Sequence, residues 1–214
     1  MKKAHIFLLS ILITMLLGCT ATIYDRSKAQ YIKEEFTLES LKSEGLALLP
    51  VHAGAGQEGY RRPFADAINR KVDSLIPSLK FYRWQKTAEL LNKHNLVKSY
   101  QDAILTYQKT AIFDKNFLYE IGSGVGARYL LFVSLQSFHT LKAIAEVKAF
   151  TQVWDCREGD VVWEGWGVAF SSGGTPSVYE DYVSVAAEGL VRKLFNLPPR
   201  RPMIFIKQKE EDEW

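Results

Sequence analysis

The sequence predicts an α/β (α+β) fold in which helices pack against a mixed sheet of about five strands. Short apolar runs such as residues 46–51 are typical of buried strands, and they alternate with longer segments of helical periodicity. Residues 145–172 alternate between the two faces of a hairpin whose loop lies between two aspartates. The predicted order is therefore strand, helix, strand, helix, helix, strand, strand, strand, helix.

The domain begins with the buried strand at residues 46–51. Pro63 suits the first turn of a helix over residues 63–76, because an N–H at that position has no partner within the helix. A short aromatic strand follows at residues 81–84, and Thr87 is expected to cap the next helix.

A further helix is expected over residues 97–112. Asp114 then caps a short helix that ends before Gly122. A buried strand covers residues 129–135, and after the hairpin the apolar residues return to helical spacing over residues 178–195.

A loop at residues 156–159 sets the register of the hairpin. With this register, Trp166 and Phe170 lie on the core face. Phe150, Trp154 and Trp163 lie together on the face turned away from the core, with Phe150 opposite Gly165. We favour an interpretation in which helices cover this face, because both faces of the hairpin are apolar. In the alternative, these side chains form an exposed patch that binds a partner protein or a second copy.

The amino terminus carries a separate signal. Lys2 and Lys3 precede an apolar stretch at residues 6–17, which is too short for a comfortable membrane span because a spanning helix needs roughly 20 residues. A basic start, a short apolar stretch and a small residue at the cut are typical of a secretory signal peptide. Residues 1–18 are therefore expected to be removed.

The residues Leu16-Leu17-Gly18-Cys19 resemble the lipobox of bacterial lipoproteins. The resemblance implies cleavage before Cys19, followed by acylation of its thiol and new amino terminus with chains such as palmitate. Several acyl chains on one residue anchor a protein stably. Thr20 stands where lipoproteins retained in the inner membrane carry aspartate, so the resemblance implies the outer membrane. The alternative is a soluble secreted protein with a coincidental cysteine.

The mature chain is predicted to have three parts. Residues 19–44 form the lipidated cysteine and a polar tether, which ends in a short helix near residues 38–43 and holds the domain off the membrane. Residues 45–195 form a periplasmic domain. Residues 196–214 form a charged, mobile tail.

Charge and cysteine content exclude some functions. Residues 1–18 hold two of the 27 lysines and arginines and none of the 24 acids. The mature chain is therefore nearly neutral, which excludes a strongly basic nucleic-acid surface.

Acylation of Cys19 leaves Cys156 without an internal disulfide partner, so its thiol is either incidental or forms an intermolecular disulfide. The histidines lack metal-ligand spacing, and no metal, cofactor or catalytic constellation is expected.

Residues 54–59 read GAGQEG, which matches the spacing of a dinucleotide-binding loop. However, the expected helix start at Pro63 is about one turn too late, and the second strand ends without the required acid. We interpret the segment as a mobile loop, with Arg61 and Arg62 at its exit as candidate contacts for a partner, a phosphate or a carboxylate. A small-ligand binder or enzyme that uses the 52–62 loop is therefore an alternative.

Three stretches carry a family resemblance: residues 46–51 (LALLPV), residues 87–131, whose last part reads YEIGSGVGARYLL, and the hairpin segments VWD and GDVVW. They resemble a group of periplasmic domains found in the curli secretion channel lipoprotein, the lipoprotein activator of penicillin-binding proteins and the amino-terminal part of the Tol–Pal translocation protein. The resemblance implies an α/β domain that binds proteins, and it carries over no functional residue.

The sequence thus predicts a non-enzymatic lipoprotein, anchored to the periplasmic face of the outer membrane, that binds another envelope protein or itself. A subunit of an oligomeric secretion pore is a second hypothesis. The chain is short for that role, because membrane-spanning strands need roughly 9–11 residues each.

Overall fold

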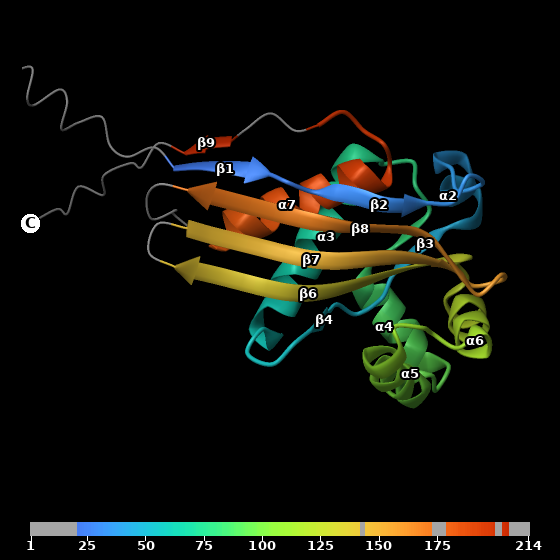
Figure 1. The fold of residues 1–214 in the computed structure, drawn as a ribbon. Coiled ribbons are helices and arrows are strands. Elements are labelled where there is room, and N and C mark those ends of the chain that lie inside the picture. The colour runs from blue at the N-terminus through green and yellow to red at the C-terminus, as the bar shows by residue number, and fades with distance from the viewer. Residues whose placement is uncertain (1–20, 142–143, 173–178, 200–202, 206–214) are drawn as a thin grey trace, which may run out of the picture.

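The computed structural model describes residues 21–141, 144–172, 179–199 and 203–205. Within them, a mixed sheet carries helices on both faces, which confirms the predicted fold class (Figure 1). The predicted signal peptide and Cys19 lie outside the described residues. None of the described helices is long and apolar enough to cross a membrane.

The described strands form a nine-stranded sheet instead of one of about five. Their order across the sheet is β5-β3-β6-β7-β8-β1-β9, while β4 pairs with β6 and β2 pairs with β8. The β3–β5, β3–β6 and β4–β6 pairs are parallel, and the other described pairs are antiparallel. Along the chain the strands are β1 (Ala21–Asp25), β2 (Lys28–Ile32), β3 (Leu46–Leu48), β4 (His52–Ala53), β5 (Phe81–Tyr82), β6 (Tyr129–Leu141), β7 (Ile144–Asp155), β8 (Asp160–Ser172) and β9 (Met203–Phe205).

The helices lie close to their predicted positions, although several of their ends differ from the prediction. Asp114 caps its helix as predicted. Thr87 caps nothing, because it lies buried inside a helix that begins at Trp84. The helix after Asp114 continues past Gly122 and ends at Gly126, whose φ of 78° is the left-handed conformation that glycine adopts readily. The helices are α2 (Leu38–Glu44), α3 (Arg61–Leu75), α4 (Trp84–Lys93), α5 (Val97–Thr110), α6 (Lys115–Val125) and α7 (Tyr179–Leu194), and a 3-10 turn, η1 (Glu58–Tyr60), precedes α3.

The prediction of a tether over residues 19–44 is wrong for its described part. β1 and β2 both pair with β8, and Ile23 is only 1% exposed in the core. These strands look polar in the sequence because an antiparallel strand with one buried face leaves every second side chain in water. The short helix expected near residues 38–43 is α2, where Thr37 and Ser40 each accept a hydrogen bond from the other's N–H at 3.2 Å.

The carboxy-terminal prediction needs a similar correction. Residues 203–205, which the sequence assigned to a mobile tail over residues 196–214, form β9 and pair with β1. Residues 200–202 and 206–214 lie outside the described part of the chain.

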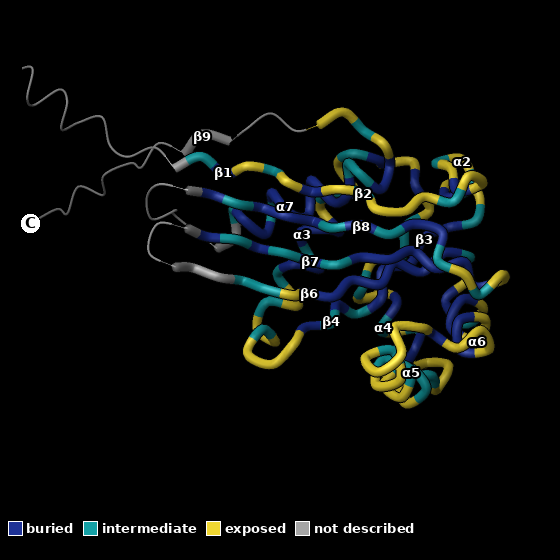
Figure 2. Tube along the Cα trace, in the orientation of Figure 1, coloured by how far each residue is buried: buried dark blue, intermediate teal, exposed yellow. Residues whose placement is uncertain are grey.

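The sheet separates two apolar cores. α3 and α7 pack on one face, where Val133, Val147 and Leu190 are completely buried. α4, α5 and α6 cover the other face only near the start of β6 and the end of β7, where they enclose Phe132 and Trp154 (Figure 1). Along the rest of that face, most of the residues that β7 and β8 turn toward it are half-buried, and they alternate with buried residues that face α3 and α7 (Figure 2).

The hairpin of β7 and β8 keeps its predicted loop but changes register. Asp155 lies opposite Asp160, as expected, and one extra residue, Val162, then inserts into β8. Because side chains alternate with a period of 2 along a strand, one inserted residue moves every later side chain of β8 to the opposite face. Phe150 consequently lies opposite Trp166 instead of Gly165.

Candidate functional site

The half of the sheet that α4, α5 and α6 leave uncovered is the candidate functional site, and we call it the open face (Figure 1). The strand register brings residues of β1, β2, β7 and β8 together there. Most of its side chains are half-buried, and Tyr24 is 43% exposed. The open face includes Tyr24, Arg26, Lys28, Gln30, Glu146, Lys148, Phe150, Glu164, Trp166 and Phe170.

Trp166 lies at the centre of the open face and is held from three sides. Its ring centroid lies 5.0 Å from that of Phe150, on the neighbouring strand. Its Nε1 donates a hydrogen bond to Gln30 Oε1 at 2.6 Å, and Lys148 Nζ lies 4.4 Å from the ring centroid. Since these contacts already fix the indole, a partner that binds it loses little further side-chain entropy.

Charged groups of both signs surround the aromatic rings. The guanidinium of Arg26 lies 3.9 Å from the ring centroid of Phe170, which is a cation–π arrangement. Glu164 accepts a hydrogen bond from Gln152 Nε2 at 2.9 Å and thereby ties the open face to the covered part of the sheet. Aromatic side chains and arginine are enriched in the cores of protein interfaces, so this composition suits a protein partner.

Of the residues that the sequence proposed on the hairpin, only Phe150 lies on the open face. Trp163 is 0% exposed and belongs to the core beneath α3 and α7. Trp154 is 3% exposed beneath α5 and α6, where its ring meets that of Phe113 edge-on at 5.3 Å between centroids. Helices therefore cover Trp154 on its expected face, as in the interpretation that the sequence favoured, whereas Trp163 is buried on the opposite face.

The bulge at Val162 explains why Trp163 lies on the other face from the one expected, whereas Trp154 on β7 keeps its expected face. The bulge turns Trp163 to the core, where its ring covers Gly165 so closely that an added Cβ would lie 2.5 Å from Cη2. The same shift moves Trp166 and Phe170, which the sequence placed on the core face, to the open face. The unbroken apolar run of residues 161–163 is the signal that could have indicated the bulge.

Arg61 and Arg62 lie at the start of α3, outside the open face. Arg62 forms an exposed ion pair with Asp66 at 3.7 Å, and burial together with the charge of Arg61 lowers the pKa of His52. An added Cβ on Gly59 would meet no atom within 4 Å, so this glycine makes none of the close packing that a dinucleotide loop requires. α3 starts two residues earlier than the sequence predicted.

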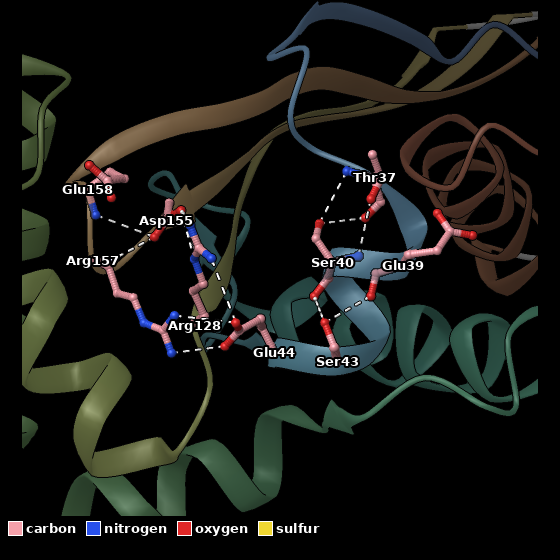
Figure 3. A network of polar contacts seen from close by, with 9 residues as sticks. All are labelled: Thr37, Glu39, Ser40, Ser43, Glu44, Arg128, Asp155, Arg157 and Glu158. Carbon is pink, nitrogen blue, oxygen red and sulfur yellow. Dashed lines mark hydrogen bonds and ion pairs between the residues drawn. The ribbon is translucent and has the colours of Figure 1, made fainter.

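A polar network lies at the end of the sheet where the 156–159 loop joins β7 to β8 (Figure 3). Arg128 donates to Asp155 Oδ2 from Nε at 2.9 Å and from Nη2 at 2.7 Å, while Arg157 Nη2 donates to Glu44 Oε2 at 2.9 Å. Burial alone would raise the pKa of Asp155, but the hydrogen bonds from Arg128 and the backbone of Arg157 lower it below its ordinary value. The network therefore ties α2, β6 and the hairpin loop together.

A cavity of about 350 Å³ lies beside this network, lined by residues that include Lys80, Tyr119 and Arg157. Cys156 also lines it, but this residue is only 3% exposed, and burial raises the pKa of its thiol to about 12. A protonated, buried thiol is a poor nucleophile, which argues against the intermolecular disulfide that the sequence left open. In the described part of the chain, no group of three or more His, Cys, Asp and Glu side chains is placed to hold a metal ion.

Comparison with known proteins gives fold likeness alone. No protein-family model and no curated protein matches the sequence. Solved structures with a similar fold include the PelC dodecamer from Paraburkholderia phytofirmans, at 10% identity and a TM-score of 0.44, which covers 83% of this chain and 99% of that one. The lipoprotein GNA1162 from Neisseria meningitidis is 10% identical, with a TM-score of 0.43 and coverages of 71% and 97%. The LpoB C-terminal domain from Salmonella enterica is 14% identical, with a TM-score of 0.39 and coverages of 64% and 86%. These values carry no argument about function.

Proposed function

We propose that this protein is a non-catalytic lipoprotein, anchored on the periplasmic face of the outer membrane, that holds another envelope protein on its open face. The observation that carries the proposal is the ordered aromatic cluster of Phe150 and Trp166 on an uncovered half of the sheet. The lipobox at Leu16–Cys19 supplies the anchor and the compartment.

The chemistry of the open face indicates the kind of partner. Phe150, Trp166 and Phe170 offer partly buried rings, and large rings that complete their burial in an interface dominate binding energies. Arg26 and Lys148 stand over two of these rings. A partner that presents aliphatic side chains flanked by acidic groups would fill the aromatic surface and pair with these cations.

Site-specific photo-crosslinking in the native host tests the binding surface. A photoreactive phenylalanine analogue replaces Phe150 in one variant and Leu105 in a matched control, because Leu105 is an apolar residue of α5 that is 57% exposed away from the open face. We expect a discrete protein adduct from position 150 and none from position 105. A band of dimer mass would identify a second copy as the partner. Absence of any adduct at position 150, or the same adduct at both positions, contradicts the proposal.

A separate experiment tests the anchor. A Cys19→Ala variant is expected to leave the membrane fraction and to remain soluble in the periplasm, while a Cys156→Ala variant stays with the membranes because its thiol is buried. Membrane association of the Cys19→Ala variant would refute lipid anchoring.

A further inference from the structure

The segment that links the proposed lipid anchor to the sheet is very short. Residue Thr20 alone separates Cys19 from Ala21, the first residue of β1. Two residue steps span at most about 7 Å even in a fully extended chain. An acylated Cys19 therefore holds the beginning of β1 within a few ångströms of the lipid headgroups, where a tether of residues 19–44 would have held the domain far away.

The strand pairing places the ends of the neighbouring strands level with the start of β1. Ile23 of β1 pairs with Ser171 of β8, Ser171 with Ala145 of β7, and Ala145 with Thr140 of β6. The outer ends of these strands therefore lie at the same level as the start of β1. The end of β9 joins them, because Phe205 pairs with Ala21. We call this group of strand ends the anchor end of the sheet; Figure 1 shows it opposite α2 and α6.

We propose that the anchor end rests on the bilayer surface and that β6, β7 and β8 run from there away from the membrane. This inference depends on the lipidation of Cys19 proposed above. β7 has 12 residues, so the opposite end with its polar network stands roughly 40 Å from the headgroups. The ligand of the anchor end is a phospholipid surface.

In the alternative orientation, the sheet would lie flat with its open face on the membrane. The position of the helices argues against this orientation. α4, α5 and α6 pack on the same side of the sheet as the open face, at its far end. A packed helix adds a layer roughly 10 Å thick, so these helices would meet a flat bilayer before the open face reached it. Glu164 on the open face would also be brought against anionic headgroups, whereas the end-on arrangement keeps it away from them.

The described side chains nearest the anchor end suit a lipid–water interface. Tyr24, three residues after the start of β1, is 43% exposed, and Arg26, five residues after that start, lies over the ring of Phe170. Tyrosine is enriched at membrane interfaces, and a basic residue near an anionic surface contributes about 1 kcal/mol of attraction.

The orientation also specifies where a partner meets the open face. Phe150 is six residues from the beginning of β7, which places it roughly 20 Å above the bilayer. A partner of the open face must therefore present its binding segment close to the membrane.

Energy transfer to labelled lipids tests the orientation in the full acylated chain, reconstituted in vesicles of phosphatidylethanolamine and phosphatidylglycerol. Glu146→Cys and Glu158→Cys variants place the same donor dye near the anchor end and in the 156–159 loop, and an acceptor dye is carried on the lipid headgroups. The two labelled positions are separated by roughly 30 Å along the direction of β7. The parent chain, with acylated Cys19 and buried Cys156, reports background labelling.

We expect transfer from position 146 to exceed that from position 158 several-fold. Equal transfer from the two positions, or a larger value at position 158, would overturn the end-on orientation while leaving lipid anchoring intact, as vesicle flotation would show. Failure of the parent chain to float with vesicles would overturn the anchoring and, with it, this inference.

Discussion

Replacement of Asp155 by asparagine tests the polar network that closes the far end of the sheet. The carboxylate accepts two hydrogen bonds from Arg128, at 2.9 and 2.7 Å, and one from the N–H of Arg157 at 2.9 Å. Its side chain is 4% exposed. Asparagine keeps the shape of the side chain but removes the charge, so the guanidinium of Arg128 loses its main counter-ion.

The expected loss of stability follows from burial. Breaking a buried ion pair by removing one partner costs about 3–5 kcal/mol, and a hydrogen bond to a charged group contributes about 1.5–3 kcal/mol. The Arg128 side chain is 25% exposed and Glu44 stays 3.8 Å away, so water and this second carboxylate compensate in part. We therefore expect Asp155→Asn to lower the free energy of unfolding by about 2–3 kcal/mol. With a urea slope of about 2 kcal/mol per molar, the midpoint falls by roughly 1–1.5 M.

The same pair predicts a pH dependence. The folded-state pKa of Asp155 is lowered from its ordinary value of 3.8. The carboxylate therefore contributes its full stabilisation above that value and loses it as the pH falls through the lowered folded-state pKa. The difference between wild type and Asp155→Asn should be constant near neutral pH and should shrink only in acid.

Urea unfolding followed by tryptophan fluorescence measures these differences. A Glu158→Gln variant is the control, because it removes an exposed carboxylate from the adjoining loop and should change the unfolding free energy by less than about 0.5 kcal/mol. The reasoning is refuted if both variants shift the midpoint equally. A difference between wild type and Asp155→Asn that persists undiminished in strong acid would refute the part assigned to the charge.

Two further predictions concern the hairpin. Gly165→Ala would place a Cβ 2.5 Å from the buried Trp163 ring, so the variant should lose about 1–3 kcal/mol of stability. Gly59→Ala is the control, because a Cβ at that position meets no atom within 4 Å and stability should change little. Thermal melts of the two variants measure the difference, and equal melting temperatures would contradict the packing argument. The buried Cys156 thiol should react with a disulfide reagent at pH 8 only after unfolding, and rapid reaction of the folded protein would show that the thiol is accessible.

The helices were the most predictable elements of the fold. Residues 97–112 and 178–195 were expected as helices and correspond to α5 and α7, because an apolar stripe at helical spacing over three or four turns is hard to produce by chance. Helix ends were less predictable. Thr87 is a good capping residue, yet it is buried inside α4, since packing on the sheet determines where that helix begins.

The candidate site was only partly predictable. Phe150, Trp154 and Trp163 were expected together on one face of the hairpin, but only Phe150 lies on the open face, and Trp166 and Phe170, which were expected on the core face, lie there with it. A single inserted residue, Val162, moves every later side chain of β8 to the opposite face, and the only hint of it in the sequence is the break in alternation at the apolar run of residues 161–163.

The sequence by itself determined what is local: the helical stripes and the hairpin loop between Asp155 and Asp160. Tertiary structure decided what depends on distant partners. Residues 21–32 bury little of their own surface and become strands only because β8 offers an unpaired edge and α7 a core for Ile23. Backbone hydrogen bonds to a strand more than 100 residues away leave no periodic trace in the sequence, so only the folded sheet reveals that pairing.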